Sequence, residues 1–131
     1  MRILVSEDDF GSRNLMLRML AALGTCEVAV DGREAVEAIT KALASGTPYD
    51  LVCLDVMMPE LDGHAVLTKL RELEAESEES TLRPAKVVMT TALSDFKTVS
   101  SAFRLRADGY LVKPIRKAAL LAKLRELGLT P

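Results

Sequence analysis

The sequence predicts an α/β fold: a doubly wound, five-stranded parallel sheet with helices on both faces. Five short apolar segments alternate with longer segments in which apolar residues recur at helical spacing. The third short segment, 51–54, is apolar throughout, as expected of a strand covered on both faces. A length of 131 residues suits one domain, 1–131, and is too short for a barrel of eight strand–helix units.

Five segments have the pattern of buried or half-buried strands. The expected strands cover residues 3–5, 26–30, 51–54, 86–89 and 110–112. In the second of them Cys26, Val28 and Val30 alternate with other residues, as in a strand. The pair Asp31-Gly32 is typical of a turn and is expected to end that strand.

Five further segments carry apolar residues at helical spacing. These residues are Leu15, Met16, Met19, Leu20 and Leu23; Ala35, Val36, Ile39 and Leu43; Val66, Leu67, Leu70 and Leu73; Val99, Ala102 and Phe103; and Leu120, Leu121, Leu124 and Leu127. Gly24 is expected to stop the first helix, and Ser94 or Asp95 to cap the fourth. Five glutamates between Glu72 and Glu79 are interpreted as a solvated helix end and loop, with an acidic docking surface as the alternative.

The composition excludes several classes of protein. Seventeen basic and nineteen acidic residues give a net charge of −2, without the basic excess typical of nucleic-acid binding. No apolar run approaches the roughly 20 residues of a membrane span, and the N-terminal segment lacks the apolar region of a signal peptide. We therefore expect a cytoplasmic protein with no nucleic-acid or membrane partner. Cys26 and Cys53 form no CxxC pattern, so they are interpreted as reduced thiols, and a zinc site is implausible.

Chemically active side chains follow four of the expected strands. Glu7-Asp8-Asp9 follows the first strand, Asp55 the third, Thr91 the fourth and Lys113 the fifth. The carboxyl ends of parallel strands lie at one edge of a doubly wound sheet, where ligands bind. Because like charges packed together need a compensating cation, and because oxygen ligands suit a hard divalent ion, Mg²⁺ is the expected metal.

These motifs give the chain a resemblance to the receiver domain of two-component response regulators over almost its whole length. The matching residues are Glu7-Asp8, Asp55, Met58-Pro59, Asp62-Gly63, Thr91-Ala92 and Lys113-Pro114. The resemblance implies a flavodoxin-like sheet with the strand order 2-1-3-4-5. It also implies that the Lys113-Pro114 bond is cis.

The resemblance further implies a role for each site residue. Asp55 would accept a phosphoryl group from a sensor histidine kinase or phosphotransfer protein. Mg²⁺ would be held by Glu7, Asp8, Asp55 and the backbone carbonyl of Met57. A transferring phosphoryl group spreads charge over its oxygens, which Mg²⁺, Thr91 and Lys113 would stabilise.

The resemblance also implies how phosphorylation would change a distant surface, through a second pair of residues. Thr91 would move toward the phosphoryl group, and Tyr110 would turn inward into the space that it leaves. The surface of the fourth helix, fifth strand and last helix, with Phe103, Tyr110, Arg116-Lys117 and Lys123, would then change shape and control a downstream protein. The protein would be a monomer or a weak phosphorylation-dependent dimer, either complete in itself or part of a longer chain.

Three residues depart from the family pattern. Glu7 replaces the commoner aspartate, Met57 is apolar where some relatives carry a polar side chain, and Arg106 stands where many relatives have glycine. His64, the single histidine, is interpreted as a solvated helix residue.

Three other functions remain open from the sequence. An aspartate-nucleophile phosphatase of the haloacid dehalogenase type needs a second aspartate at the position of Met57. A flavodoxin-like electron carrier needs a phosphate loop where Glu7-Asp8-Asp9 would repel phosphate. A receiver-like docking scaffold that accepts no phosphate is disfavoured by the complete set of acidic residues, Thr91 and Lys113.

Overall fold

Five parallel strands form one sheet in the order β2-β1-β3-β4-β5 in the computed structural model, which describes residues 1–77, 83–92 and 106–130. The strands are β1 (Arg2–Ser6), β2 (Thr25–Ala29), β3 (Leu51–Asp55), β4 (Lys86–Thr91) and β5 (Gly109–Val112). The helices of the described residues are α1 (Phe10–Leu20), α2 (Gly32–Ala44), α3 (Gly63–Glu76) and α6 (Lys117–Glu126). The predicted fold class and strand order are confirmed.

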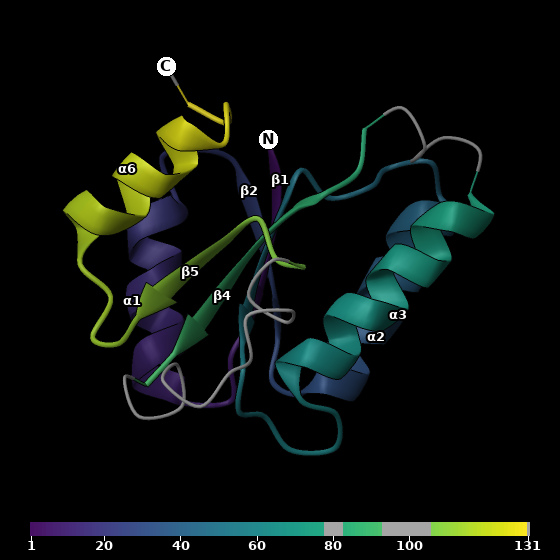
Figure 1. Ribbon diagram of the computed structural model, residues 1–131, viewed down its shortest axis with the longest axis horizontal. Helices are drawn as coiled ribbons and strands as arrows, with labels where there is room; N and C mark the ends of the chain where they lie inside the picture. The colour runs from purple at the N-terminus through teal and green to yellow at the C-terminus, as the bar shows by residue number, and fades with distance from the viewer. Residues whose placement is uncertain (78–82, 93–105, 131) are drawn as a thin grey trace.

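The helices cover both faces of the sheet, α1 and α6 on one side and α2 and α3 on the other (Figure 1). Alternate residues of each strand face opposite layers, so Leu4 packs in the α2–α3 core while Ile3 and Val5 pack in the α1–α6 core. All five residues of β3 are buried, as predicted for a strand covered on both faces. The predicted helix with Val99, Ala102 and Phe103, and its cap at Ser94 or Asp95, lies outside the described residues.

The second strand is less buried than its pattern predicts. Val28 and Val30 are 46% and 40% exposed, and Ala29 between them is fully buried. β2 lies at the edge of the sheet, where the helices cover it only in part. β2 ends at Ala29, just before Asp31-Gly32, and the same pair begins α2, because the Asp31 side chain caps that helix by accepting from the Glu34 backbone N–H at 2.8 Å.

One glutamate of the acidic segment is part of the core, so its interpretation as solvated is wrong. Glu74 is 6% exposed, and its carboxylate accepts from the Ala85 backbone N–H at 2.7 Å and from Arg71 Nη1 at 2.6 Å. Arg71 also reaches Asp108 at 3.2 Å, and Asp108 accepts from the Val87 backbone N–H at 2.7 Å. These contacts join the end of α3 to the segments that enter β4 and β5. Glu78 and Glu79 lie outside the described residues.

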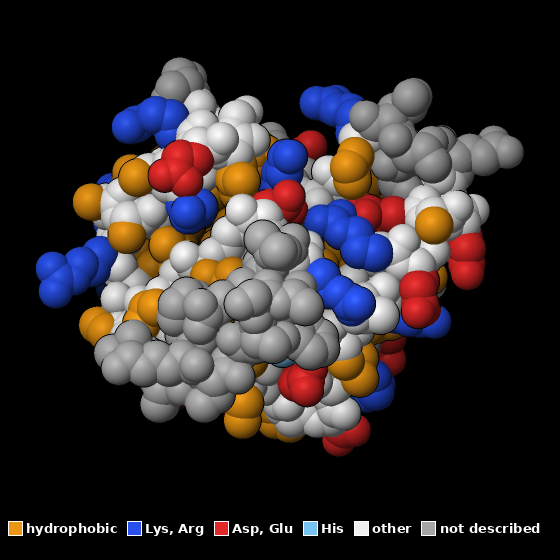
Figure 2. All heavy atoms as spheres, viewed as in Figure 1, with side chains coloured by type: hydrophobic (Ala, Val, Ile, Leu, Met, Phe, Trp, Pro, Cys, Tyr) orange, Lys and Arg blue, Asp and Glu red, His pale blue; other side chains and the backbone are white. Residues whose placement is uncertain are grey.

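Charged side chains lie on the surface in Figure 2, and the two cysteines are free thiols. Acidic and basic side chains are interspersed over the described part of the face in Figure 2. Both cysteines are free, and burial raises the pKa of the Cys53 thiol to about 12, which keeps it protonated. Within the described ranges, no helix combines the length and apolar character needed to cross a bilayer.

Candidate functional site

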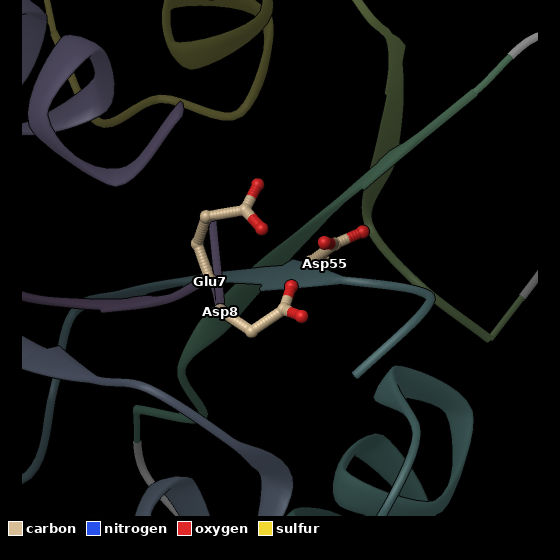
Figure 3. A group of neighbouring side chains, drawn as sticks. All are labelled: Glu7, Asp8 and Asp55. Atoms are coloured by element: carbon tan, nitrogen blue, oxygen red, sulfur yellow. The ribbon is translucent and has the colours of Figure 1, made fainter. Parts of the chain in front are cut away.

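Three carboxylates gather where β1 and β3 end (Figure 3). Glu7 directly follows β1, where its backbone N–H donates to the Ala29 carbonyl at 3.0 Å, and Asp55 is the last residue of β3. One carboxylate oxygen from each of Glu7, Asp8 and Asp55 lies within 4.8 Å of the others. Glu7 and Asp55 are buried and Asp8 is exposed, so the group opens to solvent on the side of Asp8. The strand ends thus bring these residues together as predicted.

Lys113 supplies the compensating charge for the two buried carboxylates. Its Nζ lies 2.7 Å from Glu7 Oε1 and 3.0 Å from Asp55 Oδ2. The Lys113 backbone N–H donates to the Thr91 carbonyl at 2.7 Å, which extends the pairing of β4 and β5 to the site. The Lys113-Pro114 peptide is cis, as the resemblance implied.

Burial and pairing change the proton affinities of Glu7 and Lys113. Burial, followed by the hydrogen bond with Asp55, raises the pKa of Glu7 above its ordinary 4.5 and outweighs the lowering effect of Lys113. Burial also acts to lower the pKa of Lys113, but its hydrogen bonds to Glu7 and Asp55 outweigh this effect and raise it. Lys113 is therefore charged at neutral pH and can stabilise negative charge beside Asp55.

The loop after β1 is held from both sides. Asp9 caps α1 by accepting from the Ser12 backbone N–H at 2.8 Å, and this hydrogen bond lowers the pKa of Asp9. Arg13 Nη1 donates to the backbone carbonyls of Glu7 and Asp8, at 3.0 and 3.4 Å. Asp9 therefore has a capping role and stands apart from the three clustered carboxylates.

The loop after β3 approaches Asp55 closely. The Met57 backbone N–H lies 3.3 Å from Asp55 Oδ1, and the Met57 side chain is 61% exposed. A Cβ on Gly63 would lie 2.5 Å from the Asp55 carbonyl oxygen, so only glycine fits there without displacement. Its backbone N–H donates to the Val56 carbonyl at 2.9 Å, which ties the start of α3 to the site.

Thr91 and Tyr110 lie on neighbouring strands. Thr91 is buried at the end of β4, and its hydroxyl donates to the Ala92 carbonyl at 3.3 Å. Tyr110 of β5 is half-buried against the α2–α3 core. Its hydroxyl lies 3.3 Å from His64 Nε2, so His64 is partly buried and has a protein partner besides solvent. Helical position alone gives no signal for this contact, because it depends on where β5 meets α3.

The carboxylate cluster fits a hard divalent cation. It offers three oxygen donors of the kind that Mg²⁺ binds, from two buried residues and one that faces solvent. Like charges this close repel, and Lys113 compensates two of them. The group could therefore hold a metal at Asp8, beside the existing Lys113 contacts.

Comparison with known proteins gives one consistent result. Residues 3–125 match the family model of the response regulator receiver domain. The chain is 39% identical over 127 residues to the response regulator MprA of Mycolicibacterium vanbaalenii, covering 96% of this chain and 49% of that protein. It is 33% identical over 126 residues to the transcriptional regulatory protein DltR of Streptococcus agalactiae, covering 95% and 50%. The chain thus spans about half the length of the curated relatives that it matches.

Solved structures support the same family and fold. The response regulator TrrA of Thermotoga maritima, in complex with Mg²⁺ and beryllium fluoride, is 31% identical, with a TM-score of 0.73 over 96% of this chain and 97% of that one. The receiver domain of a sensor histidine kinase from Pseudomonas aeruginosa, with a magnesium ion in its active-site cleft, has a TM-score of 0.74 at 24% identity. The superposition covers 97% of both chains and shows that they share the fold.

Proposed function

This chain belongs to the response regulator receiver domain family, and on that premise we propose that Asp55 accepts a phosphoryl group from a sensor histidine kinase or a phosphotransfer protein. An Asp55 carboxylate oxygen forms the new bond to phosphorus while the bond from phosphorus to the donor imidazole nitrogen breaks. The observation that carries this proposal is the Lys113 ammonium, 3.0 Å from Asp55 and 2.7 Å from Glu7. It orients the nucleophile and places a cation beside the incoming charge.

We propose Mg²⁺ as the cofactor of this reaction. Glu7, Asp8, Asp55 and the backbone carbonyl of Met57 would hold it, with Asp8 as the direct ligand on the solvent side. When bound, Mg²⁺ would neutralise charge on the phosphoryl oxygens. The Mg²⁺ and beryllium fluoride named for the TrrA structure support this assignment by homology.

The remaining site residues have proposed roles in binding and in signalling. The Thr91 hydroxyl would leave the Ala92 carbonyl to bind a phosphoryl oxygen, and Lys113 would bind another. Tyr110 would then change position on β5. The β5–α6 surface, which we define by Tyr110, Arg116, Lys117 and Lys123, would present the change to a downstream protein. Phe103, expected on the same surface, lies outside the described residues.

The proposed organisation is one receiver domain over residues 1–131, in the cytoplasm, as a monomer or a weak phosphorylation-dependent dimer. Its proposed partners are proteins: the phosphoryl donor and the downstream target. The exclusion of nucleic acid is proposed for residues 1–131 alone, because the matched relatives include transcriptional regulators about twice as long.

Phosphorylation with acetyl phosphate tests this function. With Mg²⁺ present, intact-mass measurement should show the addition of one phosphoryl group. Without Mg²⁺ the modified fraction should fall sharply. Asp55→Asn should accept no phosphoryl group, because its amide cannot act as the carboxylate nucleophile.

Asp31→Asn and Asp62→Asn are matched controls for the same experiment. Both residues cap helices, and asparagine caps about as well as aspartate, so the fold should be preserved. These variants should be phosphorylated like the native chain. Equal modification of Asp55→Asn and the native chain would exclude Asp55 as the acceptor, and no modification of any variant would favour the docking-scaffold alternative.

A further inference from the structure

A half-buried polar contact connects α3 to β5 on the α2–α3 side of the sheet. His64, the second residue of α3, has its Nε2 atom 3.3 Å from the hydroxyl of Tyr110, the second residue of β5. The two residues are 46 positions apart in the chain. The tyrosine hydroxyl can donate and accept, and a neutral imidazole nitrogen does one or the other according to its tautomer.

The surroundings of this contact restrict the position of the Tyr110 ring. Tyr110 is in register with Met89 of β4, and both pack in the core between the sheet and the α2–α3 pair. The Met89 Cε atom lies only 2.8 Å from the point that a Cβ on Gly63 would occupy. Met89 of β4 and Tyr110 of β5 therefore both lie against the start of α3, Met89 at Gly63 and the Tyr110 hydroxyl at His64.

We propose that His64 is a positioning residue for Tyr110, and that the state of Asp55 reaches His64 through the Tyr110 hydroxyl. The contact gives the ring a defined polar partner on α3, so a ring that moves must change or break it. A change at Asp55 would thus alter α3 as well as the β5–α6 surface. This inference rests on the proposed function, since it needs Tyr110 to move when the site is loaded.

A second route from the site to His64 must be separated from the first. The Gly63 backbone N–H donates to the Val56 carbonyl at 2.9 Å, one residue after Asp55. A change at Asp55 could reach His64 along this backbone path without Tyr110. Removal of the Tyr110 hydroxyl alone distinguishes the two routes, because it leaves the backbone path intact.

His64 is the single histidine of the chain, so its imidazole gives one unambiguous set of ring signals in an NMR spectrum of the untagged protein. Beryllium fluoride with Mg²⁺ is the probe for the loaded site, and its bound fluorine signal reports occupancy independently. In the native chain, the His64 ring signals should shift when the bound fluorine signal forms. In Tyr110→Phe the fluorine signal should form as before, while most of the His64 shift is lost.

Tyr49→Phe is the matched control. Its hydroxyl donates to Glu27 Oε2 at 2.7 Å on β2, the far edge of the sheet from β5. This variant should retain the native His64 shift. A reciprocal measurement follows the Tyr110 ring signals in His64→Leu, where they should already differ from the native ones before the probe is added.

Each outcome decides the question. A His64 shift that is equal in the native chain and in Tyr110→Phe, or absent from both while fluorine is bound, overturns the positioning role and leaves the proposed function standing. Absence of a bound fluorine signal overturns the proposed function and this inference with it. If Tyr110→Phe does not fold, unchanged Tyr110 signals in His64→Leu overturn the inference.

Discussion

At the scale of single residues, Lys113 holds together a site that would otherwise repel itself. It pairs with Glu7 and Asp55, two carboxylates that the fold buries side by side. The raised pKa of Glu7 shows that this pairing does not fully offset its burial and its proximity to Asp55. An added divalent cation should therefore relieve the remaining repulsion, and stability should depend on metal and pH together.

The pH dependence follows from the direction of the Glu7 shift. A carboxyl group with a raised native pKa contributes stability that is complete below its ordinary pKa, here 4.5, and is lost as pH rises through the native pKa. Metal binding needs ionised carboxylates. The rise in Tm caused by Mg²⁺ should therefore grow as pH increases above 4.5. In Glu7→Gln this rise should be smaller and should change less with pH.

Thermal unfolding with and without Mg²⁺, measured over a series of pH values, checks this prediction. Glu27→Gln is the control, because Glu27 lies on β2 and pairs with Arg2, away from the carboxylate cluster. It should retain the native dependence of the Mg²⁺ effect on pH. If Mg²⁺ has the same effect in Glu7→Gln as in the native chain, Glu7 is not part of the metal site.

At the scale of elements, α3 runs from the site, at the carboxyl ends of the strands, to their amino ends. Its first residue, Gly63, lies against Asp55, and its last turn carries Glu74, which binds the Ala85 backbone N–H and Arg71. The helix is thus fixed at both ends by contacts with loops of the sheet. This explains how a helix whose cap at Asp62 is exposed can hold a defined position.

Substitution of Glu74 should therefore lower the free energy of unfolding more than substitution of an exposed glutamate nearby. Glu74→Ala leaves the buried Ala85 N–H and the Arg71 guanidinium without this acceptor, which should lower the free energy of unfolding by about 1–3 kcal/mol. Glu76→Ala, two residues on at an exposed position, should change it by less than about 0.5 kcal/mol. Urea unfolding of the two variants measures the difference. Equal small losses would mean that the Glu74 contacts do not contribute to stability.

The pattern of apolar residues predicts the elements well, but not their long-range contacts. Strand and helix periods are local, so β1, β3, β4 and α6 could be found from the chain itself. The sequence gives no signal that Glu74 is buried, because the backbone N–H that it binds belongs to Ala85, eleven positions away. Val28 has the pattern of a buried strand residue, and only the position of β2 at the sheet edge exposes it.

More of the site than of the core contacts could be predicted from the sequence, because a parallel sheet places the ends of its strands together. Glu7, Asp8, Asp55 and Lys113 follow strands at recognisable positions, and the structure brings these four together. The contact between His64 and Tyr110 could not be found this way, because neither residue carries a motif for the other. Such contacts require the packing of α3 on the sheet to be known.

At the scale of the whole molecule, the sheet connects a chemical site at one edge with surfaces on the last strand and helix. β3, β4 and β5 are neighbours, and they carry Asp55, Thr91 and Tyr110 in that order. In the proposed switch, a change at Asp55 would reach β5 through the β3–β4 and β4–β5 strand pairs. The free energy available to this proposed switch is the difference in affinity of the two conformations for the phosphoryl group, so the shift should be graded.

Hydrogen exchange with and without beryllium fluoride and Mg²⁺ tests most directly whether the site is a switch. The account predicts altered protection at Asp55 and Thr91, and also in β5 and α6, which lie beyond the ligand. The amides of β2, the strand farthest from β5 in the sheet, serve as the internal reference. Asp55→Asn should show a much weaker response throughout. Changes confined to the residues that touch the ligand, with β5 and α6 unaffected, would contradict the account and identify the domain as a passive scaffold.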